Sequence, residues 1–201
     1  MNPRLVLAAA ATLASLAYAQ NAAASTTVGG GAFAIKANVS SFVAPVNVGP
    51  LASVTLPSTG GGPFTASLLN TNVLGLVNVQ AGNVSTQGDT AAGTAASSAN
   101  VANVSVAGIV TAQVATSSCS ATASSATGSS RVVGLVVAGI PISVVDIGPN
   151  TKISLPVGTV TINEQTATPT GITVNAVDVQ LNAFGLLTGN LTLAQSRCSV
   201  G

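Results

Sequence analysis

Apolar and polar residues alternate over short runs along most of this chain, and glycine, proline and asparagine separate the runs. The alternation is clear in Phe33–Val39, and Val77, Val79 and Val84 continue it further along. A period of two residues is typical of β-strands with one buried face. The stretch Val132–Gln165 divides into three or four short strands at its glycines and prolines, with a tight turn predicted at Ala138-Gly139.

This pattern predicts an all-β fold. No segment sustains the i, i+3, i+4 spacing of an amphipathic helix, whereas β-branched valine and threonine are plentiful. Short turns between strands favour hairpins, so we expect a mainly antiparallel sandwich or flattened barrel. The alternative is a β-solenoid, which uses the same residues but has a short, regular repeat.

Two segments resemble each other closely enough to suggest an internal duplication. Val46–Pro57 matches Val145–Pro156 without a gap, and the residues before Cys119 resemble those before Cys198. The related halves would run from about 38 to 121 and from about 131 to 200. The first half would contain one added hairpin at 74–99.

The N-terminus has the three parts of a secretory signal peptide. A basic start precedes the apolar run Leu5–Ala17, which is too short to span a bilayer, and Ala17 and Ala19 supply the small residues of a cleavage site. Residues 1–19 are predicted to be removed by cleavage between Ala19 and Gln20, in preference to an uncleaved anchor. Residues 20–31 would form a flexible lead-in and 32–201 a single domain.

The cysteines support export. Cys119 and Cys198 are the only two in the chain. A solitary pair in an exported protein usually forms one disulfide, whereas two free thiols would fit a cytosolic chain. The predicted location is therefore secreted, extracellular or associated with the cell envelope.

Charged residues make up only 4% of the chain. After loss of the leader, cations and acids balance, and they are Lys36, Arg131, Lys152, Arg197, Asp89, Asp146, Glu164 and Asp178. Such a chain has no basic stripe for nucleic acid and no polybasic patch for anionic lipid. No later segment is apolar for long enough to form a transmembrane helix in the mature chain.

The inventory of reactive side chains is short. The chain has no histidine, which excludes Ser-His-Asp and Cys-His arrangements and removes the commonest nitrogen ligand of metals. Asp146 and Asp178 alternate with apolar neighbours, so both are expected on a solvated strand face. Only a pairing of Glu164 with one of them would give two acids for catalysis. We predict no catalytic residue, no metal ligand and no cofactor.

Several segments taken in order resemble the choice-of-anchor P family of exported bacterial proteins. They are GLVVAGIPISV, GPNTKISLPVGTVTINEQ, ITVNAVDVQL and SRCSV, and the resemblance is best over 117–200 and weaker over 33–121. It implies an exported domain of unknown activity, often followed by a C-terminal anchor. This sequence departs from that pattern, because no anchor segment follows Cys198.

The predicted function is that of a secreted, non-enzymatic structural protein of the cell envelope or matrix. Its expected partners are further copies of itself or envelope polymers, since a surface without net charge permits close association. The alternative is a carbohydrate- or surface-binding module. Sugar sites favour aromatic platforms, and the absence of tryptophan, with Tyr18 inside the leader, weakens that alternative. An enzyme is the third and least supported class.

Overall fold

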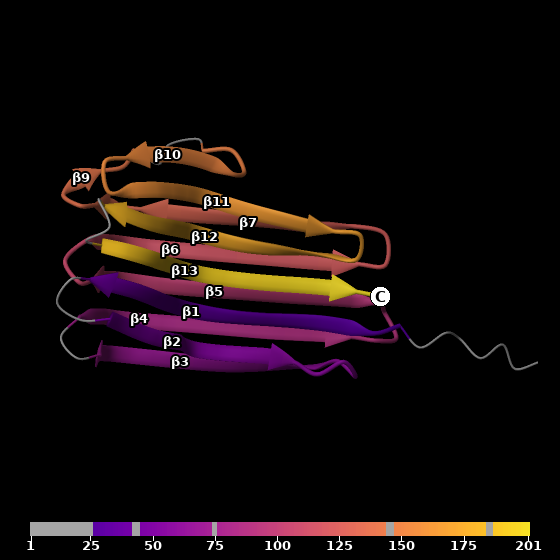
Figure 1. The fold of residues 1–201 in the computed structure, drawn as a ribbon. Helices are drawn as coiled ribbons and strands as arrows, with labels where there is room; N and C mark the ends of the chain where they lie inside the picture. The colour runs from indigo at the N-terminus through magenta and orange to yellow at the C-terminus, as the bar shows by residue number, and fades with distance from the viewer. Residues whose placement is uncertain (1–25, 42–44, 74–75, 144–146, 184–186) are drawn as a thin grey trace, which may run out of the picture.

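The structure, a computed structural model, describes residues 26–41, 45–73, 76–143, 147–183 and 187–201. Strands make up almost all of this part (Figure 1). Their bounds are β1 Val28–Ser41, β2 Pro45–Leu56, β3 Gly61–Val73, β4 Val77–Asp89, β5 Thr94–Val106, β6 Val110–Thr122, β7 Ala126–Val133, β8 Val136–Val137, β9 Ile140–Pro141, β10 Thr151–Leu155, β11 Gly158–Thr168, β12 Gly171–Ala183 and β13 Leu187–Val200.

The strands form two antiparallel sheets packed face to face. The six-stranded sheet has the order β10-β11-β12-β13-β1-β2. The seven-stranded sheet has the order β3-β4-β5-β6-β8-β9, with β7 also paired to β6. β13 lies over β5 and β6, and β1 lies over β4 and β5. The prediction of a mainly antiparallel all-β sandwich is confirmed. In the described part of the chain the two sheets form neither a closed barrel nor the solenoid that was the alternative.

The chain visits the sheets in three stages. It begins with β1 and β2, crosses to the other sheet for β3 to β9, and returns for β10 to β13. The last strand then pairs with the first, with Val200 opposite Val28. The predicted lead-in was therefore wrong at its end, since residues 28–31 belong to a central strand. Glycines in this segment belong to the strand, and Gly30 lets the two sheets approach.

The two matching segments of the proposed duplication lie at opposite edges of one sheet. Val46–Leu56 is within β2, and Thr151–Leu155 is β10. Cys119 and Cys198 each lie on the closing strand of a four-strand antiparallel series, β3–β6 and β10–β13. The segment 76–99 forms β4 and the first half of β5 rather than an added hairpin at the periphery. The duplication itself stays a prediction.

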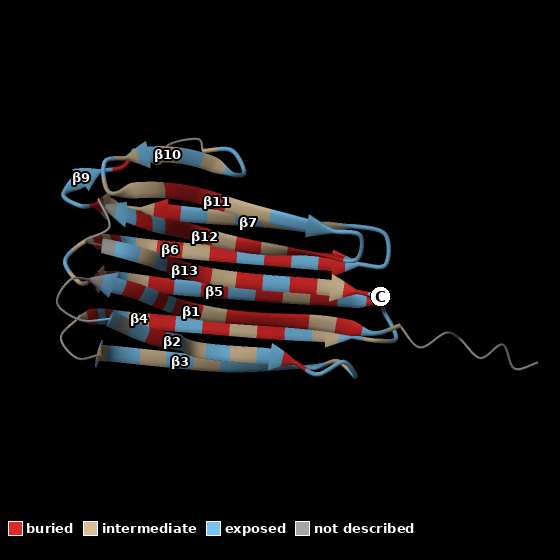
Figure 2. Ribbon diagram, viewed as in Figure 1, coloured by how far each residue is buried: buried red, intermediate tan, exposed pale blue. Residues whose placement is uncertain are grey.

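Side chains alternate between core and surface along β4, β5 and β6 (Figure 2), but in each strand the alternation changes phase once. In β4 the buried residues are Val77 and Val79, then Gly82, Val84 and Thr86. The phase changes along one line that crosses the strands of each sheet. On this line every second strand has a residue with left-handed backbone, such as Asn103 at φ 47°. Such a residue interrupts the pleat, so the alternation restarts on the opposite face.

The phase change has opposite consequences in the two sheets. In the six-stranded sheet it turns two successive residues inward, as at Ala34-Ile35 and Leu193-Ala194, all with no exposed surface. In the seven-stranded sheet it turns two outward, as at Gln80-Ala81. Along this line the six-stranded sheet therefore places extra side chains in the core, and the seven-stranded sheet places fewer there. The fit is close at this place, because a Cβ added to Gly82 would lie 3.2 Å from the Cβ of Ala34.

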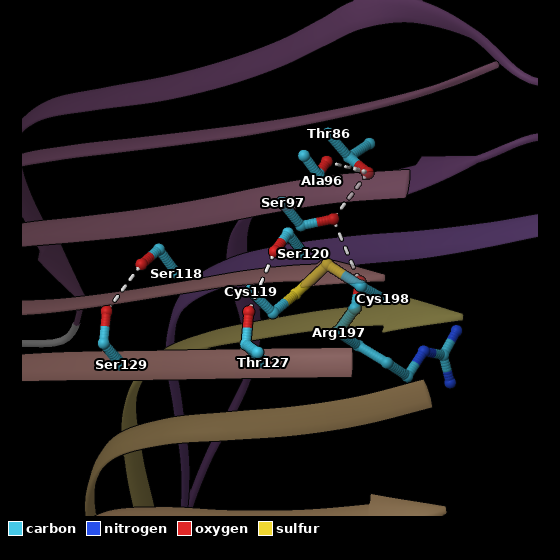
Figure 3. The surroundings of a disulfide bond; sticks show 10 residues. All are labelled: Thr86, Ala96, Ser97, Ser118, Cys119, Ser120, Thr127, Ser129, Arg197 and Cys198. Atoms are coloured by element: carbon cyan, nitrogen blue, oxygen red, sulfur yellow. Dashed lines mark hydrogen bonds between the residues drawn. A yellow bond between two sulfur atoms is a disulfide. The ribbon is translucent and has the colours of Figure 1, made fainter. Parts of the chain in front are cut away.

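A disulfide joins the sheets near the ends of β6 and β13. Cys119 and Cys198 are bonded, with 5.9 Å between their Cα atoms (Figure 3). The predicted pairing is confirmed, and it indicates an oxidising compartment. Aligned sheets usually lie about 10 Å apart, so the sandwich is narrow at this end. The close approach selects for small residues on both facing strands.

Gly30 shows how close the sheets come. A Cβ atom built at this position would lie 2.6 Å from Thr86 Oγ1 and 3.0 Å from Ser97 Oγ of the opposite sheet. Ser97 Oγ donates a hydrogen bond across the sandwich to the Arg197 carbonyl at 2.9 Å. Thr86 Oγ1 lies 2.7 Å from Ser97 Oγ, at hydrogen-bond distance, and 3.5 Å from the Ala96 carbonyl oxygen (Figure 3). The hydroxyl groups of Thr86 and Ser97 are thus buried with hydrogen-bond partners in the core.

The predicted turn at Ala138-Gly139 is confirmed. Val137 pairs with Ile140, and Ala138 and Gly139 have φ values of 49° and 78°. Two positive φ values are the mark of a type I′ turn. No atom lies within 4 Å of a Cβ built on Gly139, so backbone conformation alone selects glycine there.

We expect Gly139→Val to lower the free energy of unfolding by about 1 kcal/mol or more, because a β-branched residue is strained at positive φ. Chemical denaturation would measure the loss. Gly139→Asn is the matched control, since asparagine tolerates the left-handed region and should retain most of the stability. Equal midpoints for the valine variant and the wild type would contradict the turn's contribution.

Candidate functional site

The outer face of the six-stranded sheet gathers most of the charged side chains of the described chain. Its first row runs across the strands through Lys152, Thr161, Asp178, Thr192 and Lys36. Further along the strands, a second row comprises Glu164, Asn175, Gln195, Phe33 and Ser53, and a third comprises Thr166, Thr173, Arg197, Gly31 and Thr55. We call these three rows the polar face.

Asp178 is buried on the polar face, with 6% of its surface exposed. The prediction placed it correctly on the polar side of its strand but was wrong about solvation, because it is buried between Thr161 and Thr192, its partners on the flanking strands. Thr192 Oγ1 donates to Asp178 Oδ2 at 3.0 Å, and Asn190 Nδ2 donates to Oδ1 at 3.2 Å. A carboxylate on a central strand is thus enclosed by its neighbours.

Burial raises the pKa of Asp178 above its ordinary value of 3.8, and the Glu164 carboxylate raises it further. Hydrogen bonds from Thr192 and Asn190 act in the opposite direction. Between 3.8 and the raised pKa, the folded chain binds more protons than the unfolded chain. The stability of the fold therefore decreases as pH rises through this window.

We expect Asp178→Asn to remove this pH dependence and to raise the melting temperature at neutral pH. The amide keeps a carbonyl oxygen for Asn190 and does not repel Glu164. Thermal unfolding of both proteins from pH 3.5 to 7 would measure the effect, with the gap between them widening as pH rises. A constant gap over this range would contradict the linkage to Asp178.

Glu164 and Asp178 are the acids that the fold brings together. Glu164 Oε2 accepts a hydrogen bond from Asn175 Nδ2 at 2.7 Å, and Asn175 Oδ1 accepts one from Gln195 Nε2 at 2.8 Å. This chain of amides holds the carboxylate in place. Asp89 lies elsewhere and accepts hydrogen bonds from the backbone N–H groups of Ala91 and Ala92. Asp146 lies outside the described residues.

A shallow groove opens on the polar face beside Phe33. Its volume is about 220 Å³, and it lies over β13, β1 and β2. The residues around it are Gly31, Ala32, Phe33, Pro50, Ser53, Val54, Thr55, Gln195 and Arg197. Register explains the hollow, because Gly31 has no side chain to fill the space between Arg197 and Thr55. Sequence analysis gave no role to these residues, since only strand pairing brings them together.

The outer face of the seven-stranded sheet has a different character. Its rows consist mostly of serine and threonine, and hydroxyls of neighbouring strands bond to each other, as in Ser118–Ser129 and Ser120–Thr127 at 3.0 Å each (Figure 3). The cation on this face is Arg131, which is exposed. These hydroxyl groups form hydrogen bonds with each other within the sheet, and this face carries fewer charged groups that could recognise a ligand.

Within the described ranges, no three histidine, cysteine or acidic side chains gather where they could hold a metal ion. The same part of the chain contains no helix long and apolar enough to cross a membrane. Comparisons with protein-family models, with curated proteins and with solved structures found no match for this chain.

Proposed function

We propose that this chain is an exported, non-enzymatic structural protein of the cell envelope or matrix, and that it associates with a second copy of itself through β3. The observation that carries the proposal is the open edge of the seven-stranded sheet. In the described part of the chain β3 pairs with β4 on one side only. A row of backbone N–H and C=O groups on its other side is thereby available to another strand.

Natural edge strands usually carry devices that prevent such pairing, and β3 has few of them. Its 13 residues include no charged side chain. Phe64 and Leu69 are large apolar residues with 39% and 73% of their surfaces exposed. Pro63 and the irregular register between Gly61 and Phe64 interrupt hydrogen bonding at the beginning of the strand, and left-handed Asn70 is the one further irregularity within it. The open segment is therefore Phe64–Val73.

The other edges are better protected. Pro45 and Pro50 lie within β2, which also has an irregular register beside Pro50. At the far side of the sandwich, β9 has two residues, and the five residues of β10 include exposed Lys152. The eight residues of β7, which pair with β6 alone in the described part of the chain, include exposed Arg131. Short strands, proline, bulges and lysine all oppose edge pairing. This asymmetry favours β3, and antiparallel pairing of two β3 strands would give a closed two-fold dimer.

Two further observations support the non-enzymatic and exported parts of the proposal. The acids of the polar face are held by amides and hydroxyls, and the sequence has no histidine to activate a nucleophile. The disulfide fits an oxidising compartment, in keeping with the predicted leader at 1–19 and with the resemblance to exported choice-of-anchor P proteins.

The test is sedimentation velocity of residues 20–201 over a range of concentrations. We expect a monomer–dimer equilibrium, and we expect Ser67→Lys to weaken it about tenfold or more, because it places like charges at the shared edge. Ser118→Lys is the matched control, since exposed Ser118 lies on β6, which is paired on both sides. A monomer at every concentration, or equal effects of both variants, would contradict the proposal.

A further inference from the structure

We propose that the groove beside Phe33 binds an acidic saccharide, namely a glycan chain that contains uronic acid residues. This activity is separate from self-association, because the groove lies on the outer face of the six-stranded sheet and β3 belongs to the other sheet. The inference rests on four features of the groove: a bare floor, an aromatic wall, an unpaired cation and an oriented amide.

The floor is the backbone at Gly31. Its φ lies outside the left-handed region, so the backbone conformation does not require glycine here. A Cβ built on Gly31 would lie 3.1 Å from the Val54 carbonyl oxygen and would occupy the hollow. The volume of about 220 Å³ is below the range of about 300–1,000 Å³ that encloses whole drug-sized ligands. It suits one ring of a longer chain lying across the sheet.

The wall is the partly buried side chain of Phe33, which stands in the row between Gln195 and Ser53. A pyranose ring presents a face of C–H groups, and these pack favourably against the apolar face of an aromatic ring. The hydroxyl groups of the same sugar point sideways from the ring. They would meet Ser53 and Thr55, which are both exposed on β2 at the side of the groove.

The cation is Arg197, whose side chain extends away from the disulfide toward the outside of the sandwich (Figure 3). It is exposed, and its guanidinium has no ion-pair or hydrogen-bond partner among the described residues. The strands under the groove, β1, β2 and β13, contain Lys36 as a second cation and no aspartate or glutamate. A planar guanidinium binds a carboxylate with two parallel hydrogen bonds, which selects a uronate over a neutral sugar.

The amide is that of Gln195. Its Nε2 is engaged with Asn175 Oδ1, and Asn175 is in turn held by Glu164. This chain of bonds leaves Gln195 Oε1 as the acceptor at the groove. The result is a fixed acceptor beside the aromatic ring, positioned to receive a sugar hydroxyl. Fixed polar groups lose little conformational entropy on binding, so they favour specific recognition.

The test is titration of residues 20–201, at concentrations where the protein is monomeric, with a hexamer of galacturonic acid. A neutral glucose hexamer and inorganic sulfate serve as comparison ligands. We expect the uronate to bind, with backbone amide signals of Phe33 and Gln195 shifting in NMR spectra. The neutral hexamer and sulfate should bind at least about tenfold more weakly.

Variants locate the site. Arg197→Gln should weaken uronate binding about tenfold or more, whereas Arg131→Gln, on the outer face of the other sheet, should leave it unchanged. Thermal unfolding would verify that both variants are folded. Absence of uronate binding, equal binding of the neutral hexamer or of sulfate, or equal weakening by both arginine variants would overturn the proposal. Because the readout needs no dimer, the outcome is independent of association through β3.

Discussion

Replacing both Cys119 and Cys198 with alanine is expected to lower the free energy of unfolding by about 4 kcal/mol. The bond joins residues 79 positions apart, so it removes a large part of the conformational freedom of the unfolded chain. A domain of ordinary stability has about 5–15 kcal/mol in total. The variant is therefore expected to lose a substantial part of its stability, and urea denaturation would measure the loss.

Reduction of the wild-type protein provides the control for this prediction. A thiol reductant should shift the urea midpoint in the same direction as the double substitution and should have no effect on the alanine variant. If the wild type and the double variant unfold at the same urea concentration under oxidising conditions, the bond does not contribute as described.

Gly30→Val is expected to destabilise the fold by about 3 kcal/mol, although valine is the better strand former. Gly30 lies on a central strand opposite Thr86 and Ser97, with no room for a further carbon atom. A larger side chain must separate the sheets beside the disulfide and break the hydrogen bond from Ser97 to the Arg197 carbonyl. Denaturant unfolding would give the change in free energy.

Gly49→Val is the matched control for this substitution. Gly49 lies on the adjacent strand β2, has no positive φ, and has no atom within 4 Å of an added Cβ. The same change should therefore be neutral or slightly stabilising there. If both variants lose similar stability, the cause is a general property of glycine in strands rather than the close approach of the sheets.

Much of the architecture followed from the sequence because alternation and turn residues act locally. The fold class and the turn at Ala138-Gly139 were predicted from alternation and turn residues. The Cys119–Cys198 bond was predicted from a solitary pair of cysteines in a chain expected to be exported. The phase change along the strands was not predicted, since a single left-handed residue such as Asn103 leaves no strong signal in sequence. The need for glycine at position 30 could not be predicted either, because it comes from the close approach of Thr86 and Ser97 on the opposite sheet.

The candidate site was harder to predict than the fold. Its members belong to strands far apart in the chain, as Phe33 and Arg197 show, and only the pairing of β1 with β13 makes them neighbours. Alternation correctly placed Asp178 on the polar side of its strand. It could not predict burial by Thr161 and Thr192, because a central strand is covered by its neighbours on both sides.

The most direct test of the proposed association is hydrogen exchange of the backbone amides of β3 at low and high protein concentration. Pairing of two β3 strands predicts that amides within Phe64–Val73 exchange more slowly at high concentration, while those of Thr151–Leu155 at the opposite edge do not change. Unchanged exchange within Phe64–Val73, or slower exchange at the opposite edge instead, would contradict association through β3.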